Sequence, residues 1–343
     1  MAFLSVVTTV RATSQEDFRY GVYKSNGTAY IEKYIGSSAV VDVPSSIRAD
    51  SGDRDDEGNP IYRNYTVTCI SKYAFSGNVG ITQVSIPETI TDGSKLCIFA
   101  ECTNLREVNF KGVVRDIPTG MFSKCSNLQT LDLQWDSIES IGSGAFQDCG
   151  YDFGVLDYLP NVKTIGARAF GNVQTLTSVS LSSLTRIERE AFIGCGNLES
   201  ASVDGAGLRL EGGGENDHYT YGPFARCPKL RTVRLGDGVV SIPYRLFYGS
   251  TNLETVVLGR GITVANTVLR DLKNLTTVVA RGAIRVIPTG MFSGCSNLRT
   301  LDLKWDSVES IGSGAFQDCG YDFGELDYLP NVKTIGARAF GNV

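Results

Sequence analysis

The sequence predicts a solenoid of about twelve stacked rungs, with a parallel β-sheet on one face and short helical turns and irregular chain on the other. Three observations support this prediction: a near-exact internal duplication, a large apolar residue that recurs about every 24 positions, and a strand-like apolar pattern inside each period. One such unit cannot bury its own apolar row, but stacked units share a continuous core.

The duplication relates two long blocks of the chain. Residues 113–173 and 283–343 align without a gap and share 53 of their 61 residues. A finer period runs through both blocks and between them, with spacings of 22 to 24 residues and one of 32. Its large apolar residues are Phe75, Phe99, Phe122, Phe146, Phe170, Phe192, Phe224, Phe247, Leu269, Phe292, Phe316 and Phe340. A period of this length is typical of leucine-rich repeats, so we expect a leucine-rich repeat solenoid.

Each unit contains one short strand. The segment from Leu128 to Leu133 reads L-x-x-L-x-L, and its last apolar residues alternate with polar ones. Alternation with a period of two indicates a half-buried strand. The Ala-Phe segments, as in GARAFGN, leave room for one helical turn and nothing longer. Glycine or proline after the second apolar position, as at Gly142 and Pro118, indicates a bend.

These units resemble the BspA-type, or Treponema-type, leucine-rich repeat proteins. The segments IGARAFGNVQTLTSVSL and IPTGMFSKCSNLQTLDL follow that family's repeat closely, and residues 18–47 resemble its irregular first module. Three places depart from the pattern: the insertions 48–64 and 206–222, and Leu269 in place of Phe. The resemblance implies a non-enzymatic binding module, secreted or at the cell surface, that takes part in adhesion.

We divide the chain into three parts. Residues 1–17 are an N-terminal tail or a signal-peptide remnant, and residues 18–66 are an irregular capping module. Residues 67–343 are the solenoid, with an insertion at 206–222 and the near-duplicate blocks 113–173 and 283–343.

The last unit ends before its own strand. The preceding rung, with Leu326 and Tyr328, is therefore expected to have an unpaired edge. Repeat arrays need a polar cap at each end, so we expect that the chain is a fragment of a longer protein or that another copy covers this end. An oligomer through the uncapped C-terminal rung is the second of these alternatives.

Composition excludes several classes of function. The 32 basic and 37 acidic residues give a net charge of −5, without the basic stripe of a nucleic-acid binder. No apolar run approaches the roughly 20 residues of a membrane span. The chain has one histidine, His218, and no Walker loop, GxSxG or HExxH motif. We therefore predict no catalytic residue, no cofactor and no metal site.

Two residue types, Cys and Asn, recur at fixed positions of the repeat. Seven of the nine cysteines lie three residues after the recurrent Phe, where Asn, Val, Ser or Leu replaces them in other units. This spacing indicates a buried slot in which Cys acts as a small hydrophobe, so a hydroxyl there, as in Cys195→Ser, is expected to destabilise. Asn two residues later, as at Asn127, is expected to satisfy turn carbonyls between rungs.

The outward residues of the strands form the candidate partner-binding face. Hydroxyl groups dominate this face, with charges of both signs and no single-sign stripe. A protein or glycan ligand is the expected partner, and a merely solvated sheet face is the alternative. The candidate residues are Asn109, Asp132, Trp135, Asp157, Ser180, Ser202, Arg234, Thr255, Arg281, Asp302, Trp305 and Asp327.

Some of these residues admit a second interpretation. Trp135 and Trp305 follow duplicated strands, either as exposed anchors for a partner or as packing at the turn. Asp132 and Asp157 have the residue type of a glycosidase pair, but a solvated face is the simpler interpretation. Residues 50–59 hold five acids and fail the EF-hand pattern, so we expect a disordered charged loop there.

Two hypotheses for function remain from the sequence. The first is the extracellular binding module, and the second is a structural spacer that displays another domain. A carbohydrate-active enzyme is a third and weaker alternative, because no catalytic constellation is present.

Overall fold

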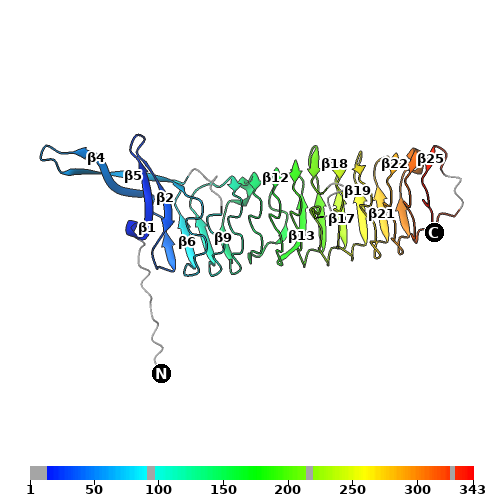
Figure 1. Ribbon diagram of the computed structural model, residues 1–343, viewed down its shortest axis with the longest axis horizontal. Coiled ribbons are helices and arrows are strands. Elements are labelled where there is room, and N and C mark those ends of the chain that lie inside the picture. Colours follow the sequence, from blue (N-terminus) through cyan, green and yellow to red (C-terminus); the bar gives the residue numbers. More distant parts are fainter. Residues whose placement is uncertain (1–13, 91–96, 214–218, 325–328) are drawn as a thin grey trace, which may run out of the picture.

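The protein is an elongated solenoid of short strands (Figure 1). This computed structural model describes residues 14–90, 97–213, 219–324 and 329–343. Besides strands, these residues form three 3₁₀ turns: η1 (Gln15–Asp17), η2 (Trp135–Ser137) and η3 (Trp305–Ser307). The predicted repeat solenoid with parallel sheet is confirmed. Leu326, Asp327 and Tyr328 lie outside the described residues.

One side of the solenoid carries the strands that the L-x-L pattern predicted, and we call it the strand face. A four-stranded sheet comes first, with β3 (Val40–Asp42), β6 (Gln83–Ile86), β7 (Glu107–Phe110) and β9 (Thr130–Asp132). A seven-stranded sheet follows, with β11 (Gly154–Leu156), β13 (Leu176–Leu181), β15 (Ser200–Val203), β17 (Thr232–Leu235), β19 (Thr255–Leu258), β21 (Thr277–Ala280) and β23 (Thr300–Asp302).

A second parallel ladder runs along another side of the stack, with very short strands. Seven of them form one sheet: β8 (Asp116–Ile117), β10 (Ser140–Ile141), β12 (Thr164–Ile165), β14 (Arg186–Ile187), β16 (Leu208–Leu210), β18 (Val239–Ile242) and β20 (Thr263–Val264). Three more form another: β22 (Val286–Ile287), β24 (Ser310–Ile311) and β25 (Thr334–Ile335). The two sheets are separate, because β20 and β22 are not paired.

Close approach of successive rungs explains the glycines in this second ladder. The Gly166 N–H donates to the Ile141 carbonyl at 2.8 Å. A Cβ on Gly166 would lie 2.4 Å from the Ser143 amide nitrogen. The bend predicted after the second apolar position is therefore set by the backbone of the previous rung.

The recurrent Phe lies in a tight turn, which we call the Phe turn, from two residues before it to two residues after it. In almost every rung the first and last residues of this turn are left-handed, with φ between 54° and 77°. Around Phe170 these residues are Arg168 and Asn172. Left-handed residues cannot continue a right-handed helix, so the helical turn expected around Ala-Phe is not formed.

Alternating backbone conformation gives the Phe turn a hydrogen-bond ladder of its own. The Phe170 N–H donates to the Ala191 carbonyl at 2.8 Å, and the Asn172 N–H to the Ile193 carbonyl at 2.8 Å. Equivalent bonds link most rungs, and in each the donor is in the earlier rung. A buried turn is therefore satisfied by its neighbour in the stack.

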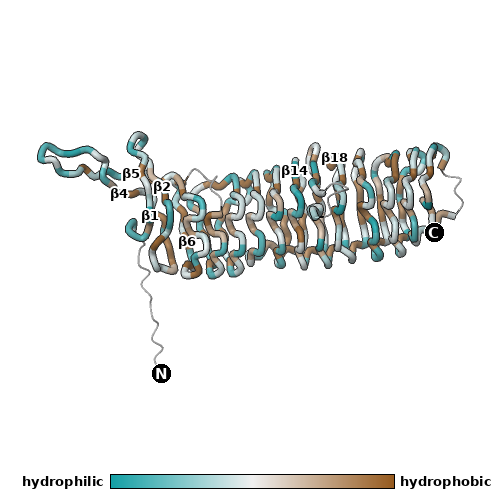
Figure 2. The backbone as a smooth tube through the Cα atoms, in the orientation of Figure 1, coloured by the Kyte–Doolittle hydropathy of each residue, from teal (hydrophilic) through white to brown (hydrophobic). Residues whose placement is uncertain are grey.

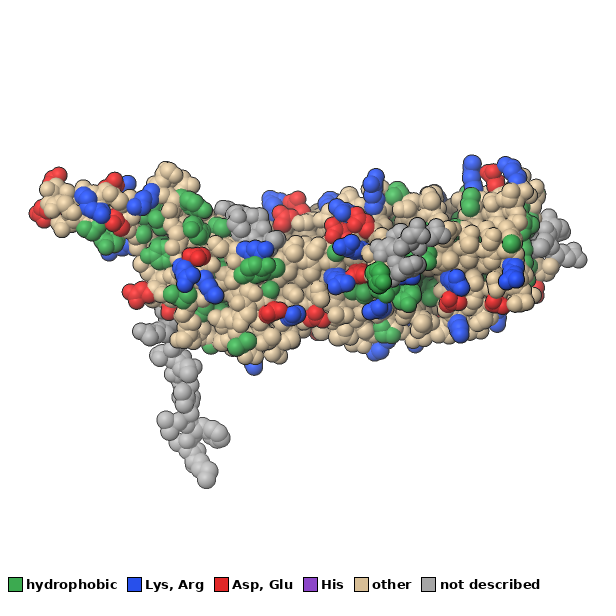
Figure 3. Space-filling model, viewed as in Figure 1, with side chains coloured by type: hydrophobic (Ala, Val, Ile, Leu, Met, Phe, Trp, Pro, Cys, Tyr) green, Lys and Arg blue, Asp and Glu red, His purple; other side chains and the backbone are tan. Residues whose placement is uncertain are grey.

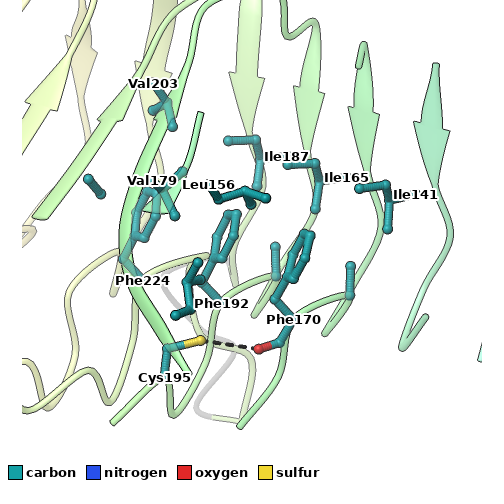
Figure 4. Packing of buried hydrophobic residues seen from close by; sticks show 14 of the residues in the cluster. Ile141, Leu156, Ile165, Phe170, Val179, Ile187, Phe192, Cys195, Val203 and Phe224 are labelled. Atoms are coloured by element: carbon teal, nitrogen blue, oxygen red, sulfur yellow. Dashed lines mark hydrogen bonds between the residues drawn. The ribbon is translucent and has the colours of Figure 1, made fainter. Parts of the chain in front are cut away.

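The Phe rings stack in the core in two runs, one from Phe75 to Phe224 and one from Phe292 to Phe340, and Figure 4 shows Phe170, Phe192 and Phe224 of the first run. Centroids of Phe170 and Phe192 are 5.2 Å apart with an interplanar angle of 3°, and Phe192 and Phe224 are 5.3 Å apart at 6°. Side chains of the two ladders, such as Val179 and Ile187, point at these rings from the other sides. Rings at this spacing pack closely against one another and against the aliphatic side chains around them.

The cysteine slot is buried, as predicted, but the thiol has a second role. Cys195 is fully buried, and its Sγ–H donates to the Phe170 carbonyl of the previous rung at 3.1 Å (Figure 4). Ser250 holds the same slot two rungs later, and its hydroxyl donates to the Phe224 carbonyl at 2.8 Å. The expectation that a hydroxyl is unfavourable here is therefore wrong, because the slot contains a carbonyl acceptor.

The asparagine ladder is confirmed. The Asn127 side-chain amide donates to the Thr103 carbonyl at 2.7 Å, and the Asn197 amide to the Gln174 carbonyl at 2.7 Å. Each amide thus satisfies a turn carbonyl of the preceding rung.

The N-terminal module continues these ladders. The Tyr34 N–H donates to the Ala74 carbonyl at 3.0 Å, and the Tyr34 ring stacks on Phe75 with centroids 5.7 Å apart. Tyr34 precedes Phe75 by 41 residues, of which the predicted insertion 48–64 accounts for 17, leaving the repeat period of 24. Tyr34 therefore occupies the Phe position of an additional rung.

A mixed sheet covers this first rung. The sheet order is β1–β2–β5–β4, with β1 (Phe18–Tyr23), β2 (Thr28–Tyr34), β4 (Ser46–Arg54) and β5 (Pro60–Ile70). The outer pairs β1–β2 and β5–β4 are antiparallel, and the central pair β2–β5 is parallel. β4 and β5 form a hydrophilic hairpin that projects from the body (Figure 2). The disordered loop expected at 50–59 is thus wrong: these residues end β4 and form the hairpin tip, where Asp55 accepts the Asn59 N–H at 2.8 Å.

Part of the predicted insertion 206–222 also belongs to the stack. Leu208–Leu210 form β16, which pairs with β14 and β18. His218 lies outside the described residues.

The ring column predicts a large cost for its disruption. Phe170→Ala leaves a cavity between two stacked rings and should lower the free energy of unfolding by about 3–5 kcal/mol. Urea unfolding followed by circular dichroism measures this loss, and a loss below about 1 kcal/mol would mean that the ring is not part of the core.

The cysteine slot predicts an order of stability among substitutions. Cys195→Ser should stay within about 1 kcal/mol of the unsubstituted protein, because a hydroxyl can reach the Phe170 carbonyl. Cys195→Ala should cost about 1–2 kcal/mol, because the donor is lost and a cavity remains. Equal stability of the two variants in urea unfolding would contradict a role for the hydrogen bond.

Thiol labelling gives an independent check of the slot. Burial raises the pKa of Cys195 well above its usual value and that of Cys227 to about 12. A raised pKa lowers the thiolate fraction at pH 8, so iodoacetamide should label the half-buried Cys69 and Cys97 first. Rapid native-state labelling of Cys195 would show that the slot is open.

Candidate binding face

Outward side chains on the seven-stranded part of the strand face lie in straight rows. Pairing is parallel and in register from β13 to β23. The central row is Ser180, Ser202, Arg234, Val257, Val279 and Asp302. The row beside it is Ser178, Ser200, Thr232, Thr255, Thr277 and Thr300. Neighbouring strands are about 4.8 Å apart, so each row presents a regular series of side chains.

The middle of this face is both apolar and cationic. Val257 and Val279 lie between Arg234, which is in the same row, and Arg281, which follows β21. Both arginines are exposed and make no ion pair with any described residue. Arg231, at the edge of the same sheet, pairs with Glu254 instead. Two available guanidinium groups beside a valine pair suit an interface, where Arg is enriched.

The two sheets of the strand face separate the first candidate residues from the others. Asn109 and Asp132 are register partners on β7 and β9, in the four-stranded sheet. Asp157 is exposed and directly follows β11, the first strand of the seven-stranded sheet. The predicted face is therefore not one continuous surface. Asp327 cannot be placed, since it lies outside the described residues.

Trp135 fills the break between β9 and β11. Its ring lies 6.2 Å from Phe146, 5.9 Å from Tyr151, 6.2 Å from Phe153 and 5.6 Å from Tyr158, measured between centroids. The sequence allows Trp135 to be either an exposed anchor or part of the packing at the turn. The structure agrees with packing, because the ring is surrounded by other rings and is only partly exposed.

The duplicated block repeats this arrangement. Trp305 lies 6.1 Å from Phe316 and 6.2 Å from Phe323. The two tryptophans thus belong to equivalent junctions of the stack, and neither projects as a free anchor.

Two tyrosines beside Trp135, between β9 and β11, have raised pKa values. Burial raises the pKa of Tyr158, and the nearby carboxylates Asp157 and Asp152 add to this effect. Burial also raises the pKa of Tyr151, although the nearby Trp135 side chain partly opposes this effect. Both tyrosines therefore act as neutral hydroxyl groups at physiological pH.

An aromatic and basic cluster on the Phe-turn side was missed by the sequence reasoning. Tyr221 and Tyr248 stack with centroids 4.9 Å apart, and the Arg226 guanidinium lies 4.7 Å above the Tyr221 ring. The Arg245 guanidinium lies 5.3 Å from Tyr248. Arg226 follows Phe224 by two residues, while Arg245 and Tyr248 flank Phe247, so the cluster joins different positions of two successive Phe turns and has no signal in the repeat pattern.

The described residues show no arrangement of a metal centre. No group of three or more His, Cys, Asp or Glu among them is placed to hold an ion. Charges of both signs are scattered over the surface visible in Figure 3, and many are paired along the rungs, as Arg115 with Glu139 at 2.6 Å. No helix within the described ranges has the length and apolar character needed to cross a membrane.

Comparison with solved structures supports the fold. A leucine-rich repeat protein from Bacteroides ovatus superposes with a TM-score of 0.60 at 23% identity, covering 95% of this chain and 90% of that one. A leucine-rich cell surface protein from Faecalibacterium prausnitzii gives a TM-score of 0.45 at 19% identity, covering 94% and 97%. At these identities the likeness concerns the fold. Comparison with curated proteins gives no match.

Comparison with protein-family models shows the family of this chain. The sequence matches the family described as BspA type Leucine rich repeat region, with six copies over residues 59–157, 153–208 and 220–343. Since these ranges include most of the chain, the protein belongs to the BspA-type leucine-rich repeat family.

Proposed function

We propose that this protein is a non-enzymatic binding module, secreted or at the cell surface, and that its strand face binds a protein partner in adhesion. Membership of a leucine-rich repeat family supports a protein-binding role in general terms. The observation that carries the finer proposal is the centre of the seven-stranded sheet, where Val257 and Val279 lie between Arg234 and Arg281.

The geometry favours an extended contact on this face. The rows run along the stack over successive strands, so a partner that follows them would touch several rungs at once. Hydroxyl groups such as Thr255 and Thr277 add hydrogen-bonding capacity beside the valines. An apolar centre with arginines and a polar rim is the usual anatomy of a protein interface.

Binding to purified extracellular-matrix proteins and to a glycan array tests the proposal. The double variant Arg234→Ala with Val257→Asp removes one guanidinium and places a charge in the apolar centre. We expect at least about tenfold weaker binding of the protein partner, as for the loss of an interface hot spot.

Arg209→Ala is the matched control. Arg209 is also an exposed strand arginine, but it lies on β16 in the second ladder. Its removal should leave affinity unchanged. Affinity that survives the strand-face variant would refute the proposal and favour the spacer hypothesis. Turnover of any glycan on the array would instead revive the enzyme hypothesis.

A further inference from the structure

The Phe-turn ladder is weakest between the rung of Phe247 and the rung of Leu269. One rung earlier the Phe224 N–H also lacks a ladder bond, but there the Arg226 N–H still donates to the Tyr248 carbonyl at 2.7 Å. In regular rungs the Phe N–H donates to the next rung, as Phe146 does to Ala169 at 2.8 Å. The Phe247 and Gly249 N–H groups and the Val268 carbonyl make no such bond with any described residue. Phe247 and Val268 are 1% and 4% exposed, so their polar groups lie at the base of the turn and not in bulk solvent, whereas Gly249 is exposed.

Two side-chain contacts that join neighbouring Phe turns are also missing at this junction. Leu269 replaces the ring, and Leu272 replaces the thiol that would donate to the Phe247 carbonyl. The strands remain paired on both sides, β19 with β21 and β18 with β20. The opening is therefore confined to the Phe-turn side of an otherwise continuous stack.

A cavity of about 350 Å³ occupies this opening. Phe247, Val268 and Leu272 line its apolar part, and Gly249 and Thr251 contribute to its polar part. The volume is within the range of small-molecule sites.

A preorganised aromatic wall borders the cavity. Tyr248 lines it, is 50% exposed, and is held by stacking on Tyr221 and by the Arg245 guanidinium. Because neighbouring groups already fix the ring, a ligand that stacks on it does not have to order it.

The polar groups of the cavity define the ligand chemistry. Phe247 and Gly249, whose N–H groups are unpaired among the described residues, line the cavity from one rung, and Val268, whose carbonyl is unpaired in the same sense, lines it from the next. A hydroxyl group can accept from such an N–H and donate to such a carbonyl. Arg270 is paired with Asp271 at 3.4 Å, which neutralises this wall of the cavity, while the Arg245 guanidinium, on the other wall, lies against the Tyr248 ring.

We propose that this junction is a saccharide-binding site, in which ring hydroxyls bridge the unpaired backbone groups of Phe247 and Val268 and the sugar's C–H face stacks on Tyr248. The site lies on the Phe-turn side, separate from the strand face. It would bind one neutral sugar residue of a glycan, with the remainder of the chain outside the cavity.

Amide NMR with a panel of neutral mono- and disaccharides of glucose, galactose, mannose and N-acetylglucosamine tests the site. At least one sugar should shift the Phe247 and Gly249 amide signals of the unsubstituted protein. Tyr248→Ala should weaken that binding about tenfold, and Tyr248→Phe should retain it.

Tyr73→Ala is the matched control, because Tyr73 is also 50% exposed but lies in an early rung. Arg234→Ala, on the strand face, should likewise leave sugar binding intact, which separates this site from the proposed protein interface. The absence of any shift across the panel would overturn the proposal. Shifts that persist unchanged in Tyr248→Ala would also overturn it. So would the finding that a protein partner, and no sugar, occupies the cavity.

Hydrogen exchange gives a second test that needs no substitution. Without sugar, the Phe247 amide should exchange faster than the Phe170 amide, which is bonded in the ladder. The sugar that gives the largest NMR shift should slow exchange at Phe247. Equal protection of both amides in the free protein would show that the ladder is closed and would overturn the site.

Discussion

Stacking of the buried Phe rings is the interaction on which the other features of this solenoid depend. Successive rings such as Phe146 and Phe170 lie 5.6 Å apart and nearly parallel. This spacing brings each Phe turn within hydrogen-bond distance of the next, which in turn allows left-handed residues such as Arg168 to be tolerated. With the turns fixed, the strands on the other sides come into register over many rungs.

The first rung shows how the stack can begin without an exposed edge. Tyr34 takes the place of a Phe, and Phe18 packs on it with centroids 5.4 Å apart. The free edge of the covering sheet is partly blocked by Gln15, whose side chain donates to the Arg48 carbonyl and accepts its N–H. Such blocking of an edge strand reduces unwanted pairing with other chains. The hairpin at 48–64 can project from this rung because its residues lie outside all the ladders.

Sequence periodicity was sufficient for the repeat, the strand positions and the asparagine ladder, because each depends on contacts between identical positions of adjacent units. It was not sufficient for the Cys195 hydrogen bond, since the pattern does not reveal that the Phe170 carbonyl points into the slot. The β4–β5 hairpin was missed because its residues are polar on both faces and show no apolar alternation.

Candidate surface residues were harder to place for a related reason. Rows on the strand face follow directly from the register, so Ser180, Ser202 and Arg234 could be aligned from the sequence. Trp135 could not, because the unit after it deviates from the repeat and separates β9 from β11. The orientation of a side chain at such a break depends on which neighbours close the gap, and here these are Tyr151, Phe153 and Tyr158.

Regularity also determines which chemistry each side of the stack can offer. In an unbroken Phe turn the inter-rung donors and acceptors are used within the stack, so that side can present only side chains to a ligand. Backbone groups become available only where a unit departs from the repeat, as at Leu269. The strand face differs, because its backbone is paired throughout β13 to β23 while its outward side chains remain accessible. Recognition through side chains on the strand face and through backbone at a repeat defect can therefore coexist in one solenoid.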